Sequence, residues 1–157
     1  MFHNIPKKYK ILILGSYHPQ NYLYLNELCT FLKKKGFLNT FLARELVKTK
    51  HISEFDHNIP KMEFIFTEIE KLMNKADFLL FVFFEDYNES VIVELTSVLK
   101  TKNFKDNQTV ALIPNNYNIS MLEGLISQQK LNVFRYYSFS EILEYSKNFI
   151  LRNILTG

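Results

Sequence analysis

The chain has few of the residues that mark specialised classes of protein. Its 157 residues include one cysteine, Cys29, no tryptophan and only four glycines and four prolines. A single cysteine excludes an internal disulfide and a cysteine-rich zinc site, and the histidines lack the spacing of metal ligands. The longest apolar run, residues 78–84, has the length of a strand rather than a membrane span. We therefore expect no metal and no membrane partner.

The chain also has no strong excess of positive or negative charge. There are 19 Lys and Arg residues against 16 Asp and Glu, which gives a net charge of +3. Nucleic-acid binders carry a concentrated basic face, so nucleic acid is not an expected partner. The first residues are polar and basic and do not resemble a signal peptide, which predicts a cytoplasmic location. The hydrophobic fraction of 47% and the length predict one globular domain over residues 1–157.

Segments typical of strands and of helices alternate along the chain. Apolar runs predict strands that are buried on both faces, and each is followed by a region that can form a helix. The strands are expected at residues 10–14, 37–42, 77–84, 109–113 and 132–136. The clearest helices are expected at residues 22–35 and 61–75, within 83–99, and from two capping-box sequences that begin at Ser120 and Ser138. Residues 43–60 show no clear pattern and are expected to be irregular.

This alternation predicts an α/β fold. The expected architecture is a three-layer, doubly wound (flavodoxin-like or Rossmann-like) parallel sheet of five strands in the order 2-1-3-4-5. In such a sheet, ligands bind beyond the carboxyl ends of the strands where the strand order reverses. That point lies between the first and third strands.

One carboxylate in the predicted helix after the third strand has an unusual position. Val91, Leu95 and Val98 repeat at helical spacing and would face the core, and Glu94 lies on the same stripe. Two explanations are open. Either Glu94 reaches water at the edge of the stripe, or it is held in a pocket for chemistry. The topology favours a site here, because Glu94 lies about one turn into the helix that leaves the third strand.

Two polar loops are expected to end at the same place. One follows the first strand, and the other, residues 85–90, follows the third. Gly15 also suits an ordinary turn, and Arg44, just past the second strand, suits either a phosphate contact or the surface. The residues that we predict to contact a ligand are Gly15, Ser16, Tyr17, Asn88, Ser90 and Arg44.

Three sequence features carry a resemblance to a known family. The blocks KILILGSYHP and KADFLLFVF, followed by Ser90 and by Glu94-Leu95, resemble the nucleoside 2-deoxyribosyltransferase-like proteins. Those proteins are similar in turn to the Toll/interleukin-1 receptor (TIR) domains that cleave NAD. The resemblance implies that Glu94 is the catalytic glutamate at an N-glycosidic bond, that Gly15 and Ser16 enclose the base or sugar, and that Ser90 contacts a phosphate.

The resemblance covers the first two thirds of the chain and has two departures. Family members usually carry glycines just before the glutamate, whereas residues 90–93 here are Ser-Val-Ile-Val. No residue aligns cleanly with the family's supporting aspartate, for which Glu68 and Glu70 are the nearest candidates. Self-association into a dimer or larger oligomer is a further implication of the resemblance.

The candidate residues suit chemistry at an N-glycosidic bond. Breaking this bond builds oxocarbenium character on the sugar, which a carboxylate can stabilise or attack. We expect cleavage or base exchange on a nucleoside, a nucleotide or NAD, with NAD as a substrate and no cofactor. The alternative is a non-catalytic nucleotide-binding sensor or assembly module that uses the same crevice, which the bulky residues 91–93 favour.

Overall fold

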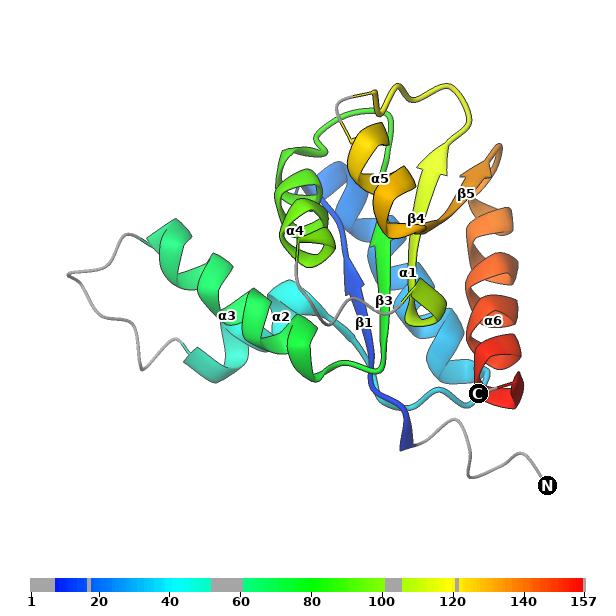
Figure 1. The fold of residues 1–157 in the computed structure, drawn as a ribbon. Helices are drawn as coiled ribbons and strands as arrows, with labels where there is room; N and C mark the ends of the chain where they lie inside the picture. The colour runs from blue at the N-terminus through cyan, green and yellow to red at the C-terminus, as the bar shows by residue number, and fades with distance from the viewer. Residues whose placement is uncertain (1–7, 17, 52–60, 101–105, 121, 157) are drawn as a thin grey trace.

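The structure is a computed structural model that describes residues 8–16, 18–51, 61–100, 106–120 and 122–156. Its strands are all parallel and lie in the order β2-β1-β3-β4-β5 (Figure 1), which confirms the predicted fold class and strand order. The strands are β1 (Ile11–Leu14), β2 (Thr40–Leu42), β3 (Phe78–Val82), β4 (Thr109–Pro114) and β5 (Asn132–Tyr136). The helices are α1 (Pro19–Lys34), α2 (Ala43–His51), α3 (Lys61–Lys75), α4 (Glu89–Leu99), η3 (Asp106–Gln108), α5 (Glu123–Gln129) and α6 (Phe139–Thr156).

Successive residues of the central strands face opposite layers of the molecule. In β1, Ile11 and Ile13 belong to a core cluster with α1 and α6, whereas Leu12 and Leu14 belong to a cluster with α2, α3 and α4. All four side chains are buried. Helices α1 and α6 therefore cover one face of the sheet and α2 to α5 the other (Figure 1). Burial on both faces explains why these strands are continuous apolar runs in the sequence.

The segment after β2 differs from the prediction. Residues 43–51 form helix α2, so the expectation of irregular structure there was wrong. Ala43 and Val47 are four residues apart and bury one stripe of this helix, while the rest of it is mostly polar. The remaining residues of that region, 52–60, lie outside the described residues.

The two predicted capping boxes have different outcomes. The carboxylate of Glu141 accepts a hydrogen bond from the backbone N–H of Ser138 (3.2 Å), which is one of the two bonds of the predicted capping box at the start of α6. The Ser138 hydroxyl pairs instead with the hydroxyl of Ser140 (3.0 Å). Helix α5 begins at Glu123 rather than at Ser120, and no side chain caps it. The side-chain oxygen of Asn118 accepts a hydrogen bond from the Ser120 N–H (2.9 Å) and holds Ser120 in the preceding loop.

Candidate active site at the switch point

The carboxyl ends of β1 and β3 are adjacent, and the loop after β3 divides the crevice beyond them. The side-chain amide of Asn21 in α1 donates to the carbonyl of Asp86 (3.0 Å), which ties this loop to α1. A cavity of about 480 Å³ lies toward α3 and α4, and another of about 650 Å³ lies toward α1 and α6. Glu94 lines the first, which we call the Glu94 cavity. Four tyrosines line the second, which we call the tyrosine cavity.

Glu94 is buried and lacks hydrogen-bond partners among the described residues. Its exposed fraction is 2%, and neither carboxyl oxygen forms a hydrogen bond within the described part of the chain. Burial raises the pKa of Glu94 from 4.5 to about 8, so a neutral carboxylic acid predominates at pH 7. Of the two explanations that the sequence left open, the exposed edge position is therefore wrong.

Ser16 and Ser90 line the same cavity as Glu94. The hydroxyl oxygen of Ser16 accepts a hydrogen bond from the backbone N–H of His18 (3.1 Å), and its O–H has no acceptor among the described residues and can donate to a ligand. The hydroxyl of Ser90 donates to the carbonyl of Gly15 over a long 3.5 Å, linking the first turn of α4 to the end of β1. Three of the predicted site residues therefore converge, Ser16 from the loop after β1 and Ser90 and Glu94 from α4.

Gly15 lies in a closely packed turn and does not have an unusual backbone angle. A Cβ atom at this position would lie 2.9 Å from both terminal methyl carbons of Leu25 and 3.2 Å from the carbonyl oxygen of Val82. These distances are shorter than ordinary van der Waals contacts. The absent side chain lets the chain leave β1 close to α1 and β3, and this brings Ser16 to the cavity.

Two other predicted ligand contacts, Asn88 and Arg44, do not line the Glu94 cavity. The side chain of Asn88 is buried and bonded to the backbone of Phe84, accepting from its N–H (2.8 Å) and donating to its carbonyl (2.6 Å). It closes the β3–α4 loop and lines neither cavity. Arg44 is exposed at the start of α2 and also lines neither cavity. Tyr17 lies outside the described residues.

A stacked pair of rings also lines the Glu94 cavity. The rings of His18 and Tyr87 are parallel within 3°, with their centroids 3.8 Å apart. Tyr87 has a φ of 65°, in the left-handed region that residues other than glycine seldom adopt. Strained conformations of this kind concentrate at functional sites. The sequence offers no signal for the pair, because the two residues are far apart in the chain and meet only through the fold.

The wall contributed by α3 is apolar and consists of Ile65, Phe66 and Ile69. Among the described lining residues there is no lysine or arginine, and Glu89 adds a carboxylate at the start of α4. An acidic first turn is a poor partner for a phosphate, although a helix N-terminus by itself attracts anions. This cavity therefore fits an uncharged group better than an anion.

The two candidates for a supporting carboxylate have other partners. Glu68 forms an ion pair with Lys71 of the same helix (3.0 Å), and Glu70 accepts a hydrogen bond from the hydroxyl of Ser97 (3.0 Å). Neither lines the Glu94 cavity. Glu68 is therefore positioned by a contact within α3, and Glu70 by a contact between α3 and α4.

Within the described residues, no three His, Cys, Asp or Glu side chains converge as metal ligands would. No described helix is both long enough and apolar enough to cross a bilayer. No family model and no curated protein matches the chain. The resemblance to the deoxyribosyltransferase-like proteins therefore stays a prediction based on the quoted motifs.

Proposed function

We propose that the protein cleaves or exchanges the N-glycosidic bond of a nucleoside-like compound in the Glu94 cavity. The observation that carries this proposal is the carboxyl group of Glu94, which is buried in the wall of a ligand-sized cavity and has no hydrogen-bond partner among the described residues. A buried polar group without a partner costs about 1–3 kcal/mol of stability. Groups kept in such environments with a strongly shifted pKa are typical of functional sites.

The ionised form of Glu94 is the reactive one in this proposal. The bond between C1′ and the base nitrogen breaks, and its electron pair leaves with the base. The carboxylate stabilises the resulting oxocarbenium ion or attacks C1′ to form an ester. Water or a second base then attacks C1′ and releases the carboxylate, and the proton that the incoming water or base loses is taken up by the base that has left. Sugar hydroxyls that donate to the Glu94 oxygens would lower its pKa in the complex and favour this ionised form.

The lining of the cavity supports an uncharged nucleoside as the preferred substrate. Ser16 and Ser90 can hydrogen-bond to sugar or base, and the α3 wall offers an apolar surface to a ring. No lysine or arginine among the described lining residues would neutralise a phosphate. Nucleotides and NAD, which the motif resemblance also allows, would have to keep their phosphates outside the cavity.

A second candidate function is nucleoside binding without turnover, as in a sensor or assembly module. It is favoured by the same burial that raises the pKa of Glu94 to about 8. A neutral carboxyl group donates one hydrogen bond and accepts others, which suits recognition of the edge of a base. In this case, Glu94 would orient the ligand and form no bond to it.

The two candidates are separated by incubating the protein with nucleosides, nucleotides and NAD and measuring released base by chromatography. Glu94→Gln keeps the size and the hydrogen-bonding capacity of the side chain but removes the nucleophile. An enzyme would release base, and Glu94→Gln would abolish the release. Glu144→Gln is the matched control, because Glu144 is exposed on α6. Thermal stabilisation by a nucleoside without released base would support the binding module, and the absence of both would contradict both functions.

A further inference from the structure

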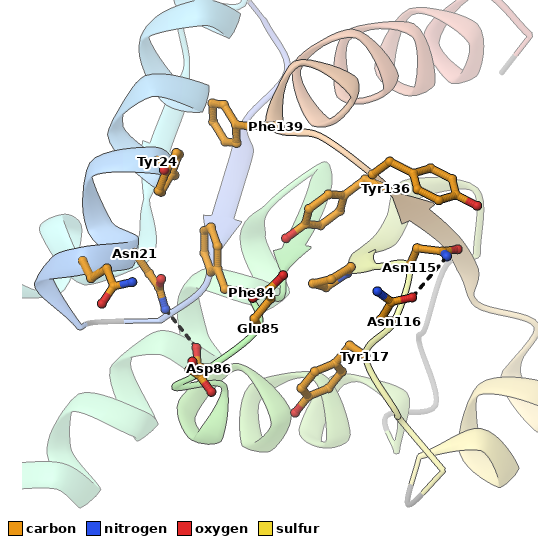
Figure 2. A pocket seen from close by; sticks show the side chains of 13 residues that line it. Asn21, Tyr24, Phe84, Glu85, Asp86, Asn115, Asn116, Tyr117, Tyr136 and Phe139 are labelled. Atoms are coloured by element: carbon orange, nitrogen blue, oxygen red, sulfur yellow. Dashed lines mark hydrogen bonds between the residues drawn. The ribbon is translucent and has the colours of Figure 1, made fainter.

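The tyrosine cavity is independent of the residues used in the proposed function. It lies at the carboxyl ends of β3, β4 and β5, with α1 and α6 as side walls (Figure 2). Its volume of about 650 Å³ is in the range that holds a whole small molecule. The β3–α4 loop separates it from Glu94, and no residue lines both cavities.

Aromatic rings make up much of the wall and come from several elements. They belong to Tyr24, Phe84, Tyr117, Tyr136, Tyr137 and Phe139. The ring of Tyr24 lies 5.9 Å from that of Phe84 and 5.0 Å from that of Phe139, with interplanar angles of 40° and 58°. The ring of Tyr24 therefore forms tilted contacts with the other two along one wall of the cavity. Figure 2 shows the rings of Phe84, Tyr117 and Tyr136 around Glu85.

The charged groups of the lining all have one sign. Glu85 and Asp86 line the cavity, whereas no lysine, arginine or histidine does so among the described residues. This is a local reversal in a chain whose net charge is +3. Both acidic residues are exposed, and neither forms an ion pair within the described part of the chain. Their negative charge is therefore available to a ligand.

Hydrogen bonds hold these walls in place. The hydroxyl of Tyr136 donates to the carbonyl of Phe83 (2.7 Å). The guanidinium of Arg135 donates to the carbonyls of Pro114 (3.1 Å) and Tyr117. It braces the β4–α5 loop from outside the lining instead of neutralising the carboxylates. A cavity fixed in this way loses little entropy when a ligand binds.

We propose that the tyrosine cavity is a binding site for a small organic cation, with a quaternary ammonium group as its best ligand. A cation is attracted to the faces of aromatic rings, and aromatic cages recognise quaternary ammonium groups by this interaction. Glu85 and Asp86 add a compensating negative charge at the same place. The same carboxylates repel phosphates and carboxylates, so anionic ligands are excluded.

The test compares choline with 3,3-dimethylbutan-1-ol, which has the same shape but carries no charge. Each is titrated into the full chain, and binding is followed by the aromatic and amide NMR signals of the protein. We expect saturable shifts with choline and an affinity at least about tenfold lower for the uncharged compound. No saturable binding of choline at millimolar concentration, or equal binding of the two compounds, would overturn the proposal.

Paired variants locate the site. Tyr24→Leu removes a ring and should weaken choline binding about tenfold, whereas Tyr24→Phe keeps the ring and should retain it. Glu85→Gln should also weaken binding. Both positions are exposed enough to tolerate substitution, and thermal unfolding verifies the fold of each variant. Glu94→Gln should bind choline like the unaltered chain. The site would be contradicted if Tyr24→Leu and Tyr24→Phe lost choline affinity equally. It would also be contradicted if neither Tyr24→Leu nor Glu85→Gln changed the affinity.

Discussion

The imidazole ring of His18 lies flat against the phenol ring of Tyr87, with the ring centroids 3.8 Å apart. The Nδ1 atom of His18 accepts a hydrogen bond from the Gln20 N–H (3.2 Å), so the neutral ring carries its proton on Nε2. The stack joins the start of α1 to the β3–α4 loop, and both rings line the cavity that contains Glu94. A flat aromatic wall beside a buried carboxyl group suits a ligand with a planar base.

Tyr87→Gly should weaken nucleoside binding without unfolding the protein. Glycine adopts a φ of 65° without strain, which offsets part of the stability lost with the ring. If the pair contacts a base, loss of one ring should raise the dissociation constant about tenfold, since stacking on an aromatic ring contributes about 1–3 kcal/mol per base. Nucleoside-dependent thermal stabilisation measures the effect. Tyr87→Phe keeps the stack and should bind normally, so equal losses in the two variants would contradict a stacking role.

The pH dependence of stability should differ between the unaltered chain and Glu94→Gln. Between about pH 4.5 and pH 8, Glu94 is ionised in the unfolded chain but protonated in the folded one, so the folded state binds more protons. The free energy of unfolding therefore falls as pH rises, by up to about 1.4 kcal/mol per pH unit from this group. Glu94→Gln lacks this loss and should gain stability relative to the unaltered chain as pH increases.

Urea unfolding at pH 5, 6, 7 and 8 measures this difference, and subtraction of the two curves removes the contributions of other groups. Glu144→Gln is the control, because Glu144 is exposed and its pKa is lowered by its hydrogen bond to Lys147. The stability of Glu144→Gln relative to the unaltered chain should not increase between pH 5 and pH 8. Parallel curves for Glu94→Gln and the unaltered chain would mean that Glu94 is ionised in the folded protein.

The rate of base release should rise with pH if Glu94 acts as a carboxylate. The value of kcat/KM reports ionisation in the free enzyme. It should increase about tenfold per pH unit at low pH and level off near pH 8, where burial places the pKa of Glu94. A rate that falls through this range would instead assign Glu94 as a general acid that protonates the leaving base. The measurement is a pH profile for the best substrate of the nucleoside panel.

The sheet and the place of Glu94 on an apolar helical stripe were predictable from local patterns, whereas its burial was decided only by the structure. Strands that are buried on both faces are continuous apolar runs, and this does not depend on the rest of the fold. Residues 11–14 and 78–82 are examples. Glu94 lies on an apolar helical stripe, and that stripe faces the core whenever α4 packs on the sheet. Both inferences depend on periodicity within one segment. They did not require knowledge of which distant side chains meet.

The division of the crevice was not predictable, because it depends on contacts between distant residues. The bond from Asn21 to Asp86 joins α1 to the β3–α4 loop, whose residues line one cavity on each side. The acidic lining of the tyrosine cavity also appears only when the ends of β3, β4 and β5 are brought together. Helix α2 was missed for a local reason, since its segment is mostly polar and, of the side chains described in it (residues 43–47), Ala43 and Val47 are the buried ones.

Asn88 illustrates the same limit. Nothing in the sequence distinguishes a polar loop residue that contacts a ligand from one that supports the loop. Both polar groups of its side chain are bonded to the backbone of Phe84. Asn88→Ala should leave a buried N–H and a buried carbonyl without partners and lower the free energy of unfolding by about 2–3 kcal/mol. Asn88→Asp should restore only the acceptor and remain destabilised.

Urea unfolding of these variants tests the supporting role of Asn88, with Asn26→Ala as the control. Asn26 is exposed in the middle of α1, where alanine is a good helix former, so that variant should unfold within about 0.5 kcal/mol of the unaltered chain. If Asn88→Ala were as stable as the control but lost nucleoside binding, Asn88 would be a ligand contact. A loss of stability larger in Asn88→Ala than in Asn88→Asp, with both well below the control, would instead show that its two bonds to Phe84 hold the loop between the cavities.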